Sequence, residues 1–326
     1  MNKFDADIIA NTISHQWAQL KELNTSLRVL SEHPLHLRVS KTSDTNRVFI
    51  FRFNKEPLNL VLPTLKSMEV SKGRNGNQVD VIFELRDGEF SDVFDTFLFD
   101  LVASSINATT EMAAMIVVQR LKRWSELFKS RIEDKLSAAE ILGLRAELSV
   151  VRQLLKSGWD HHVVIKGWRG PEGDATDIGL DSMRIEVKAS WATSHNRVEI
   201  SSADQLDTDE KPLFLARILL NASDDAGESI NDLVRSIEGM IEANGSSPIE
   251  FRSKLMLAGF VDERDQFDES YEESEGRWYE IRDGFPRITT EMLAPQITNV
   301  RYRIELGTLN EFLVASETVL DQSNAK

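Results

Sequence analysis

The stretch ATDIGLDSMRIEVKAS, residues 175–190, places three chargeable side chains among apolar residues. A two-residue turn after Leu180 would form a hairpin in which Asp177 lies directly opposite Glu186. Lys188 follows Glu186 by two residues and therefore lies on the same face of the strand. Two carboxylates held side by side repel each other unless a shared proton or a cation relieves them. The hairpin therefore predicts a divalent metal site.

The chemistry of such a site is phosphodiester hydrolysis. Mg²⁺ binds through one or two carboxylates and keeps water or phosphate oxygens in its other positions. Lys188 could then stabilise the negative charge that develops on phosphorus, or orient the attacking water. A solvated strand face is the alternative interpretation, because Glu-x-Lys is common on exposed strands. The helix that precedes the hairpin favours the site.

This helix is predicted to begin at Ser137, the first residue of the capping box SAAE, and to run to about Lys156. On a helical wheel Glu147 falls inside the arc of Ile, Leu and Val side chains. The opposite face is polar and includes Arg145 and Ser149. A carboxylate that faces a core needs a partner, so Glu147 is a candidate site residue. A buried arginine or a backbone amide as that partner is the alternative.

Residues 1–135 are predicted to form an α+β domain with an antiparallel sheet. A helix over 5–30 opens the domain, and helices over 92–106 and 109–131 close it. Between them lie strand-like segments, separated by loops such as SKGRNGNQ: LHLRV, RVFIFRF, LNLVL and VDVIFEL.

Residues 136–326 alternate between helix and strand patterns, which predicts an α/β core with a mixed sheet flanked by helices. After the hairpin come a strand near 197–201, the short turn SADQLD, the strand LFLARILL and a helix over 229–243. Further strands and a closing helix form the tail. The block VDERDQFDESYEESEG carries eight acids and one arginine, and predicts a solvated loop.

The composition is that of a globular protein, with 41% hydrophobic and 28% charged residues. We expect a cytoplasmic protein, because no apolar run of about 18 residues and no secretion signal is present. The absence of cysteine excludes disulfides, thiolate nucleophiles and cysteine zinc sites. Any metal must therefore be held by oxygen or imidazole ligands.

The net charge of −15 argues against a nucleic-acid partner unless cations are concentrated locally. The acidic excess lies entirely in the second part of the chain, because residues 1–135 hold 18 Lys+Arg and 18 Asp+Glu. We expect the N-terminal domain, or a partner protein, to hold double-stranded DNA. The candidate phosphate contacts are Arg120, Lys122 and Arg123 of the basic helix, and Lys72 and Arg74 of a loop. Cations near a helix C-terminus also favour the helix dipole, which is the alternative role of the first group.

The histidines are weaker candidates. His161 and His162 are predicted on an extended segment, where adjacent rings would point in opposite directions. His195 lies in a predicted loop, TSHNR, close in sequence to the hairpin, and could contact phosphate. Surface histidines are the alternative for all three.

The order of GLRAELSVVRQLL, GPEGDATDIGL, RIEVKAS and ISSADQL resembles the PD-(D/E)XK nuclease superfamily. Within it the chain is most similar to an uncharacterised bacterial family of PD-(D/E)XK members found in restriction-modification and phage-defence loci. The later segments FRSKLMLAGF, WYEI and GFPRIT resemble that family too. The resemblance implies a restriction-endonuclease-like core preceded by the α+β domain.

The resemblance also implies roles for five residues. Asp177 and Glu186 correspond to metal ligands, Lys188 to the catalytic lysine, Glu147 to an auxiliary helix acid and Gln205 to a downstream polar residue. Thr176 stands where the motif has proline, and Asp174 is a competing acid three residues before Asp177. We favour Asp177 as the ligand.

The implied activity is that of a Mg²⁺-dependent endodeoxyribonuclease, with Mn²⁺ as a substitute, in a restriction or anti-phage system. Double-strand cleavage would suit a homodimer, and other defence-system subunits are expected partners. The alternative is a noncatalytic DNA-binding or scaffold subunit of a multi-protein defence complex that retains the nuclease fold.

Overall fold

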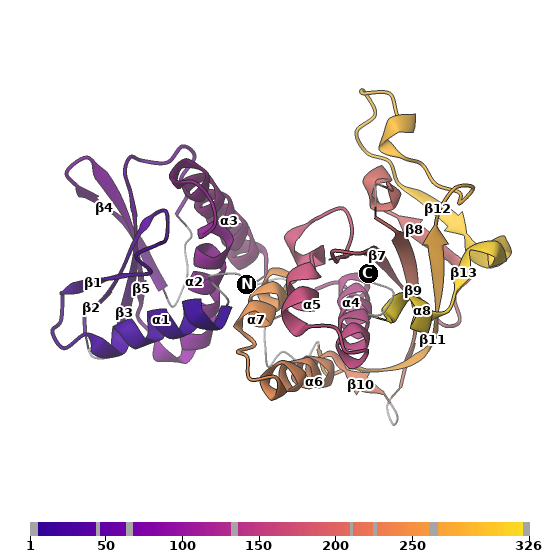
Figure 1. Ribbon diagram of the computed structural model, residues 1–326, viewed down its shortest axis with the longest axis horizontal. Coiled ribbons are helices and arrows are strands. Elements are labelled where there is room, and N and C mark those ends of the chain that lie inside the picture. The colour runs from indigo at the N-terminus through magenta and orange to yellow at the C-terminus, as the bar shows by residue number, and fades with distance from the viewer. Residues whose placement is uncertain are drawn as a thin grey trace. The chain divides into compact units, whose positions relative to one another are not determined.

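A computed structural model describes residues 6–43, 46–62, 68–131, 136–208, 211–223, 227–260 and 267–321. The chain is a mixed α/β protein with two compact units (Figure 1). Unit 1 comprises Met1–Lys135 and Ser246–Gly259, and unit 2 comprises Leu136–Gly245 and Phe260–Lys326. No helix in the described ranges has the length and apolar character needed to cross a membrane.

Unit 1 is built on a five-stranded antiparallel sheet with the strand order β1-β2-β3-β5-β4. Alternation in β5 buries every second side chain against the helices, where aromatic rings such as Phe83 and Phe97 make edge contacts. The other face is polar and carries the ion pair of Arg52 and Asp80. The elements are β1 (Ser26–Val29), β2 (His36–Lys41), β3 (Arg47–Phe53), β4 (Met68–Asn75), β5 (Gln78–Leu85), α1 (Ala6–Gln19), α2 (Ser91–Ser105), α3 (Thr110–Arg131) and α7 (Ile249–Leu257).

Three sequence predictions for unit 1 were wrong. The first helix ends at Gln19, and the predicted helix cannot continue to Leu30, because Asn24 has a φ of 60° and residues 26–29 pair with β2 as a strand. The segment LNLVL is not a strand, and Asn59 within it has a φ of 59°. Its place in the sheet is taken by β4, which includes much of the predicted loop SKGRNGNQ. A turn at Gly76, with a φ of 61°, joins β4 to β5.

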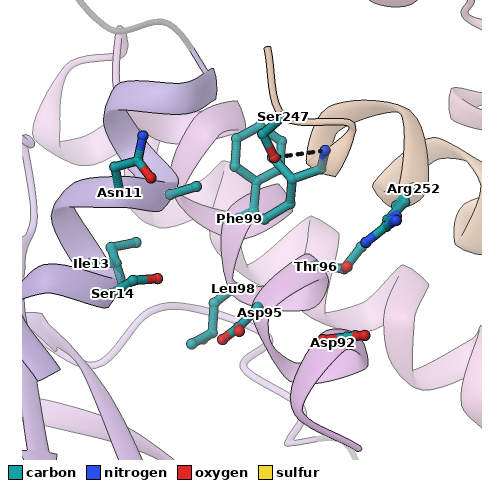
Figure 2. A pocket seen from close by; sticks show the side chains of 12 residues that line it. Asn11, Ile13, Ser14, Asp92, Asp95, Thr96, Leu98, Phe99, Ser247 and Arg252 are labelled. Carbon is teal, nitrogen blue, oxygen red and sulfur yellow. Dashed lines mark hydrogen bonds between the residues drawn. The ribbon is translucent and has the colours of Figure 1, made fainter. Parts of the chain in front are cut away.

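Helix α7 was assigned by sequence to the second domain, but it packs in unit 1 against α1 and α2. A hollow of about 250 Å³ lies among these three helices. Figure 2 shows Asn11, Asp92 and Arg252 at its edge, with Ser247 Oγ accepting a hydrogen bond from the first amide of α7 at 3.3 Å. The buried residues of α7 include the polar Ser253 and Lys254 as well as apolar side chains. Its sequence therefore does not show the alternation of apolar and polar faces by which a surface helix is predicted.

Unit 2 contains a mixed sheet with the order β10-β11-β9-β7-β6, in which only the β7 and β9 pair among the described strands is parallel. Helix α4 packs on β7 and against α6. The elements are α4 (Ala138–Lys156), α5 (His161–Gly167), β6 (Ile178–Gly179), β7 (Arg184–Trp191), β8 (Arg197–Ile200), β9 (Leu213–Ala222), β10 (Glu228–Ser229), α6 (Ile230–Ala243), β11 (Ser270–Ile281), β12 (Tyr302–Glu305), β13 (Leu313–Val314) and α8 (Ser316–Leu320). A separate ladder joins β8 to β12, and β13 pairs with β11.

Helix α4 confirms the predicted capping box, since Ser137 and Glu140 exchange hydrogen bonds at its start. Part of its polar face is buried, because Arg145 and Ser149 are each only 1% exposed. Arg145 lies 3.5 Å from Glu228 and 3.6 Å from Glu273, on strands that cover this face. Helix α4 therefore packs on β7 with its apolar face and contacts Glu228 and Glu273 through Arg145 on its polar face.

Two further predictions for unit 2 were wrong. His161 and His162 begin helix α5, capped by Asp160, instead of lying on an extended segment. Part of the acidic block forms the start of β11, because Ser270 onward pairs with β10 and β9. Residues 261–266 of that block lie outside the described residues.

Candidate active site

The hairpin of β6 and β7 has the predicted register. Ile178 lies opposite Ile185, which puts Asp177, one residue before β6, opposite Glu186. The amide of Val187 donates a hydrogen bond of 2.7 Å to Asp177 Oδ2. The backbone of the strand that carries Glu186 therefore fixes the carboxylate of Asp177.

The loop before the hairpin fixes the backbone of Asp177. Its carbonyl oxygen accepts hydrogen bonds from the amides of Arg169 and Gly170 at 2.7 and 3.0 Å. The competing acid Asp174 is exposed and pairs with Arg169 at 3.3 Å. The structure thus brings Asp177, and not Asp174, beside Glu186.

Glu186 is a fully buried carboxylate with 0% exposure. Neither of its oxygens accepts a hydrogen bond from the described residues, although Lys188 Nζ lies 2.7 Å from Oε1 as an ion pair. Burial and then the charge of Asp177 raise the pKa of Glu186 to about 8, while Lys188 opposes the shift. A buried carboxylate is unfavourable unless it binds a proton or a cation.

Lys188 and Gln205 are joined by a hydrogen bond. Lys188 Nζ donates to Gln205 Oε1 at 3.2 Å, and the amide of Ser201 donates to the same oxygen at 2.9 Å. Gln205 lies in a 3-10 helix, Ala203–Leu206, which is anchored by the buried side chain of Leu206. The amide oxygen of Gln205 therefore orients the ammonium group of Lys188.

Glu147 reaches the same cluster from α4. The indole of the fully buried Trp168 donates a hydrogen bond of 2.7 Å to Glu147 Oε2. Burial and then the charge of Asp177 raise the pKa of Glu147 well above its ordinary value, and the bond from Trp168 opposes this. The partner is thus an indole, where the sequence suggested an arginine or a backbone amide.

Gly170 makes room for two carboxylates at once. A Cβ atom at this position would lie 2.5 Å from Glu147 Oε2 and 3.1 Å from Asp177 Oδ1. Both oxygens therefore lie directly over the glycine. Sequence reasoning missed Gly170 and Trp168, because nothing in the loop GWRGPEGD says which atoms the fold brings against it.

The donor set fits a hard divalent cation. Asp177 and Glu186 supply carboxylate oxygens, which Mg²⁺ prefers, and both side chains are held beside each other by the hairpin. No group of three acidic or histidine side chains in the described ranges already surrounds one ion position. The protein would therefore offer these two carboxylates and leave the remaining positions to water and substrate, as is common for Mg²⁺.

The basic helix α3 is only partly available for phosphate contacts. Arg120 is 17% exposed and pairs with the buried Asp100 at 3.4 Å. Asp100 also accepts a hydrogen bond of 2.8 Å from the buried indole of Trp124. Lys122 is exposed and Arg123 is half-buried. Arg120 is therefore engaged by Asp100 inside unit 1.

The second basic group lies on strand β4. Lys72 pairs with Glu56 at 2.5 Å, whereas Arg74 is 80% exposed and lies 3.9 Å from the same carboxylate. Glu56 therefore offsets part of this positive charge. Arg74 is the better placed of the two residues to meet a phosphate.

We predict that the stability of the metal-free protein falls as pH rises from about 4.5 to about 8. The folded state binds the proton of Glu186 more tightly than the unfolded chain, so this contribution is present below the ordinary pKa and lost through the raised one. Glu186→Gln keeps the neutral form and should raise the Tm by at least about 2 °C at pH 8, with little effect near pH 4.5. Thermal unfolding at both pH values measures this. The exposed Glu242→Gln is the control, and a Tm difference for Glu186→Gln that does not grow with pH would contradict the prediction.

We predict that Gly170→Ala displaces Glu147 or Asp177, because the new Cβ would overlap Glu147 Oε2. Mn²⁺ affinity, measured by titration calorimetry, should fall by about 10-fold or more, the effect typical of losing an outer-shell contact. Gly143→Ala in α4 is the matched control, since its Cβ meets nothing within 4 Å and alanine favours the helix. Equal Mn²⁺ affinity in Gly170→Ala and the wild type would refute this role.

Comparison with known proteins agrees with the geometry. The family model described as "Putative PD-(D/E)XK family member, (DUF4420)" matches residues 13–307, a range that includes the whole cluster from Glu147 to Gln205. Searches of curated proteins and of solved structures gave no match. The match covers most of both units, and on this basis the chain belongs to that PD-(D/E)XK family.

Proposed function

We propose that the protein is a metal-dependent endodeoxyribonuclease that hydrolyses DNA phosphodiester bonds in the bacterial cytoplasm, in a restriction or anti-phage system. The observation that carries the proposal is the buried pair of Asp177 and Glu186, with Lys188 on the same strand. Family membership supports a nuclease-like fold.

We further propose that unit 2 has a restriction-endonuclease-like core. In support, its sheet is mixed, α4 packs on β7, and β7 and β9 run parallel. The site residues occupy one strand, the residue before a neighbouring strand, and a helix packed on that sheet. Such a framework holds the side chains on regular elements, which position them more accurately than loops.

The roles follow from the contacts. A Mg²⁺ or Mn²⁺ ion bound by Asp177 and Glu186 would lower the pKa of a water and neutralise charge on the phosphate. Lys188, oriented by Gln205, would donate to a phosphate oxygen and stabilise the negative charge that develops on it. Glu147, held by Trp168, can keep or release a proton as the charge around Asp177 changes.

A noncatalytic DNA-binding or scaffold subunit is the second candidate. It is favoured by the ion pair of Lys188 and Glu186, because the ammonium group compensates the buried carboxylate without a metal ion. A fold that had lost catalysis could keep this pair for stability alone. Separate substitution of the two residues distinguishes the candidates.

We predict that the wild type cuts plasmid DNA in the presence of Mg²⁺ or Mn²⁺ and not with EDTA. Asp177→Asn, Glu186→Gln and Lys188→Met should each lower the rate by about 100-fold or more, because each removes a ligand or a charge from the reacting phosphate. Gel electrophoresis of the products measures the rate. Asp174→Asn, on the exposed acid, is the control and should cut at the wild-type rate.

Two results would overturn the nuclease proposal. Cutting that survives all three substitutions means that the reaction occurs elsewhere or in a contaminant. A folded wild type that never cuts, even with the other subunits of its defence system, supports the scaffold.

We also propose that unit 1 holds double-stranded DNA through Lys122 and Arg123 of α3 and through Lys72 and Arg74 of β4. Arg120 is omitted because it pairs inside the unit. Cleavage of both strands would require two copies of the site, so a homodimer on DNA is part of this proposal.

We predict that Lys72→Ala combined with Arg74→Ala weakens duplex binding. Loss of two phosphate contacts should reduce the slope of log K against log salt by about 1.8. Filter binding across a salt series, without partners, measures it. Arg235→Ala, which removes an exposed cation of α6, is the control. An unchanged affinity and slope would rule out these two residues as DNA contacts.

A further inference from the structure

A hollow of about 350 Å³ opens where β7 ends, beyond the strand residues that form the candidate site. Ser190 and Trp191 of β7 line it, together with Arg197 of β8 and Leu142 of α4. From Lys188 to Trp191 the strand advances by three residues, or about 10 Å. The hollow is therefore within reach of a nucleotide that neighbours a phosphate at Lys188.

A buried arginine fixes the wall of this hollow. Arg217 of β9 is 3% exposed and lies beside Lys188 in the parallel register. Its guanidinium donates to Ser190 Oγ at 3.1 Å, to Asn196 Oδ1 at 2.7 Å and to the carbonyl of His195 at 3.1 Å. Burying a guanidinium is unfavourable unless such bonds compensate it. The segment 191–196 is thus tied to the same strands as the candidate site.

The hollow presents an aromatic ring and a cation. Trp191 is 39% exposed, and its ring lies 6.1 Å from the ring of Tyr271 between centroids. The exposed guanidinium of Arg197 makes no hydrogen bond or ion pair within the part of the chain that the structure describes. Arg303, by contrast, is neutralised by Glu199 at 3.0 Å. Arg197 is therefore available to an anionic ligand.

We propose that this hollow binds one unpaired nucleotide of the DNA substrate, with its base against Trp191 and a phosphate on Arg197. The inference rests on the proposed DNA cleavage, and it specifies the form of DNA that the site prefers. Stacking on a tryptophan needs a base that has left the duplex, at an overhang or rotated out of the helix. A simple anion would use Arg197 but gain nothing from the exposed indole.

The test compares two labelled duplexes, one blunt and one with a single-stranded overhang, by fluorescence anisotropy with Ca²⁺ in place of Mg²⁺. The wild type should bind the overhang duplex more tightly. Trp191→Ala should weaken overhang binding by about 5-fold or more, the usual range for a base stacked on an aromatic ring, and leave blunt binding unchanged. Trp191→Phe should restore most of the preference. Trp191→Leu keeps apolar bulk beside Tyr271, and serves if the alanine variant unfolds.

Arg197→Ala should weaken overhang binding and lower its salt slope by about 0.7 to 0.9, the value for one phosphate contact. Arg235→Ala on α6 is again the control for an exposed arginine. Undiminished binding by Arg197→Ala would remove this residue from the proposed pocket.

Cleavage of both duplexes by the same preparations separates this inference from the proposed function. If the wild type cuts DNA but shows no overhang preference, or if Trp191→Ala and Trp191→Leu keep that preference, the nucleotide pocket is refuted and the nuclease stands. If the wild type never cuts DNA but prefers the overhang duplex, and the Trp191 variants lose that preference, the pocket stands and the nuclease proposal falls. A wild type that neither binds nor cuts DNA refutes both.

Discussion

Two carboxylates held opposite each other in a buried hairpin repel, and much of unit 2 is arranged around that repulsion. The amide of Val187 holds Asp177, Lys188 compensates Glu186, and the indole of Trp168 binds Glu147. Each contact reduces the cost of burying charge, yet the pKa of every carboxyl in the cluster stays raised. The cluster is therefore held together by packing and does not stabilise the fold by itself.

The packing that holds it comes from outside the cluster. Helix α4 is tied on its far side by Arg145, which faces Glu228 and Glu273, and so it cannot move away from β7. The parallel neighbour β9 fixes β7 along its length. On the other side of Lys188, the buried Leu206 anchors the short helix that carries Gln205. The stability of the unit thus keeps unfavourable groups close together, which is typical of functional sites.

The sequence was informative where the relevant interactions are local. The period of two in RIEVKAS predicted the face shared by Glu186 and Lys188, and the capping box predicted the start of α4. It failed where distant segments decide the outcome. The burial of Arg145 depends on strands 83 and 128 residues later in the chain, and the space over Gly170 depends on a helix and a hairpin that meet there. Within unit 1, Asn24 and Asn59 lie in the left-handed region at places where the apolar pattern predicted a helix and a strand.

The raised pKa values also bear on how an acidic protein can admit DNA. Burial and the charge of Asp177 raise the pKa of Glu186 to about 8, so this carboxyl holds a proton at neutral pH and the cluster repels an approaching phosphate less than its three acids would suggest. Lys188 Nζ lies 2.7 Å from Glu186 and becomes its counter-ion when the carboxyl ionises. Once Glu186 is ionised, release of that ammonium toward a phosphate requires another positive charge next to Glu186, because an unpaired buried carboxylate is strongly unfavourable. Cation binding and phosphate contact by Lys188 are therefore expected to be coupled through the single carboxylate of Glu186.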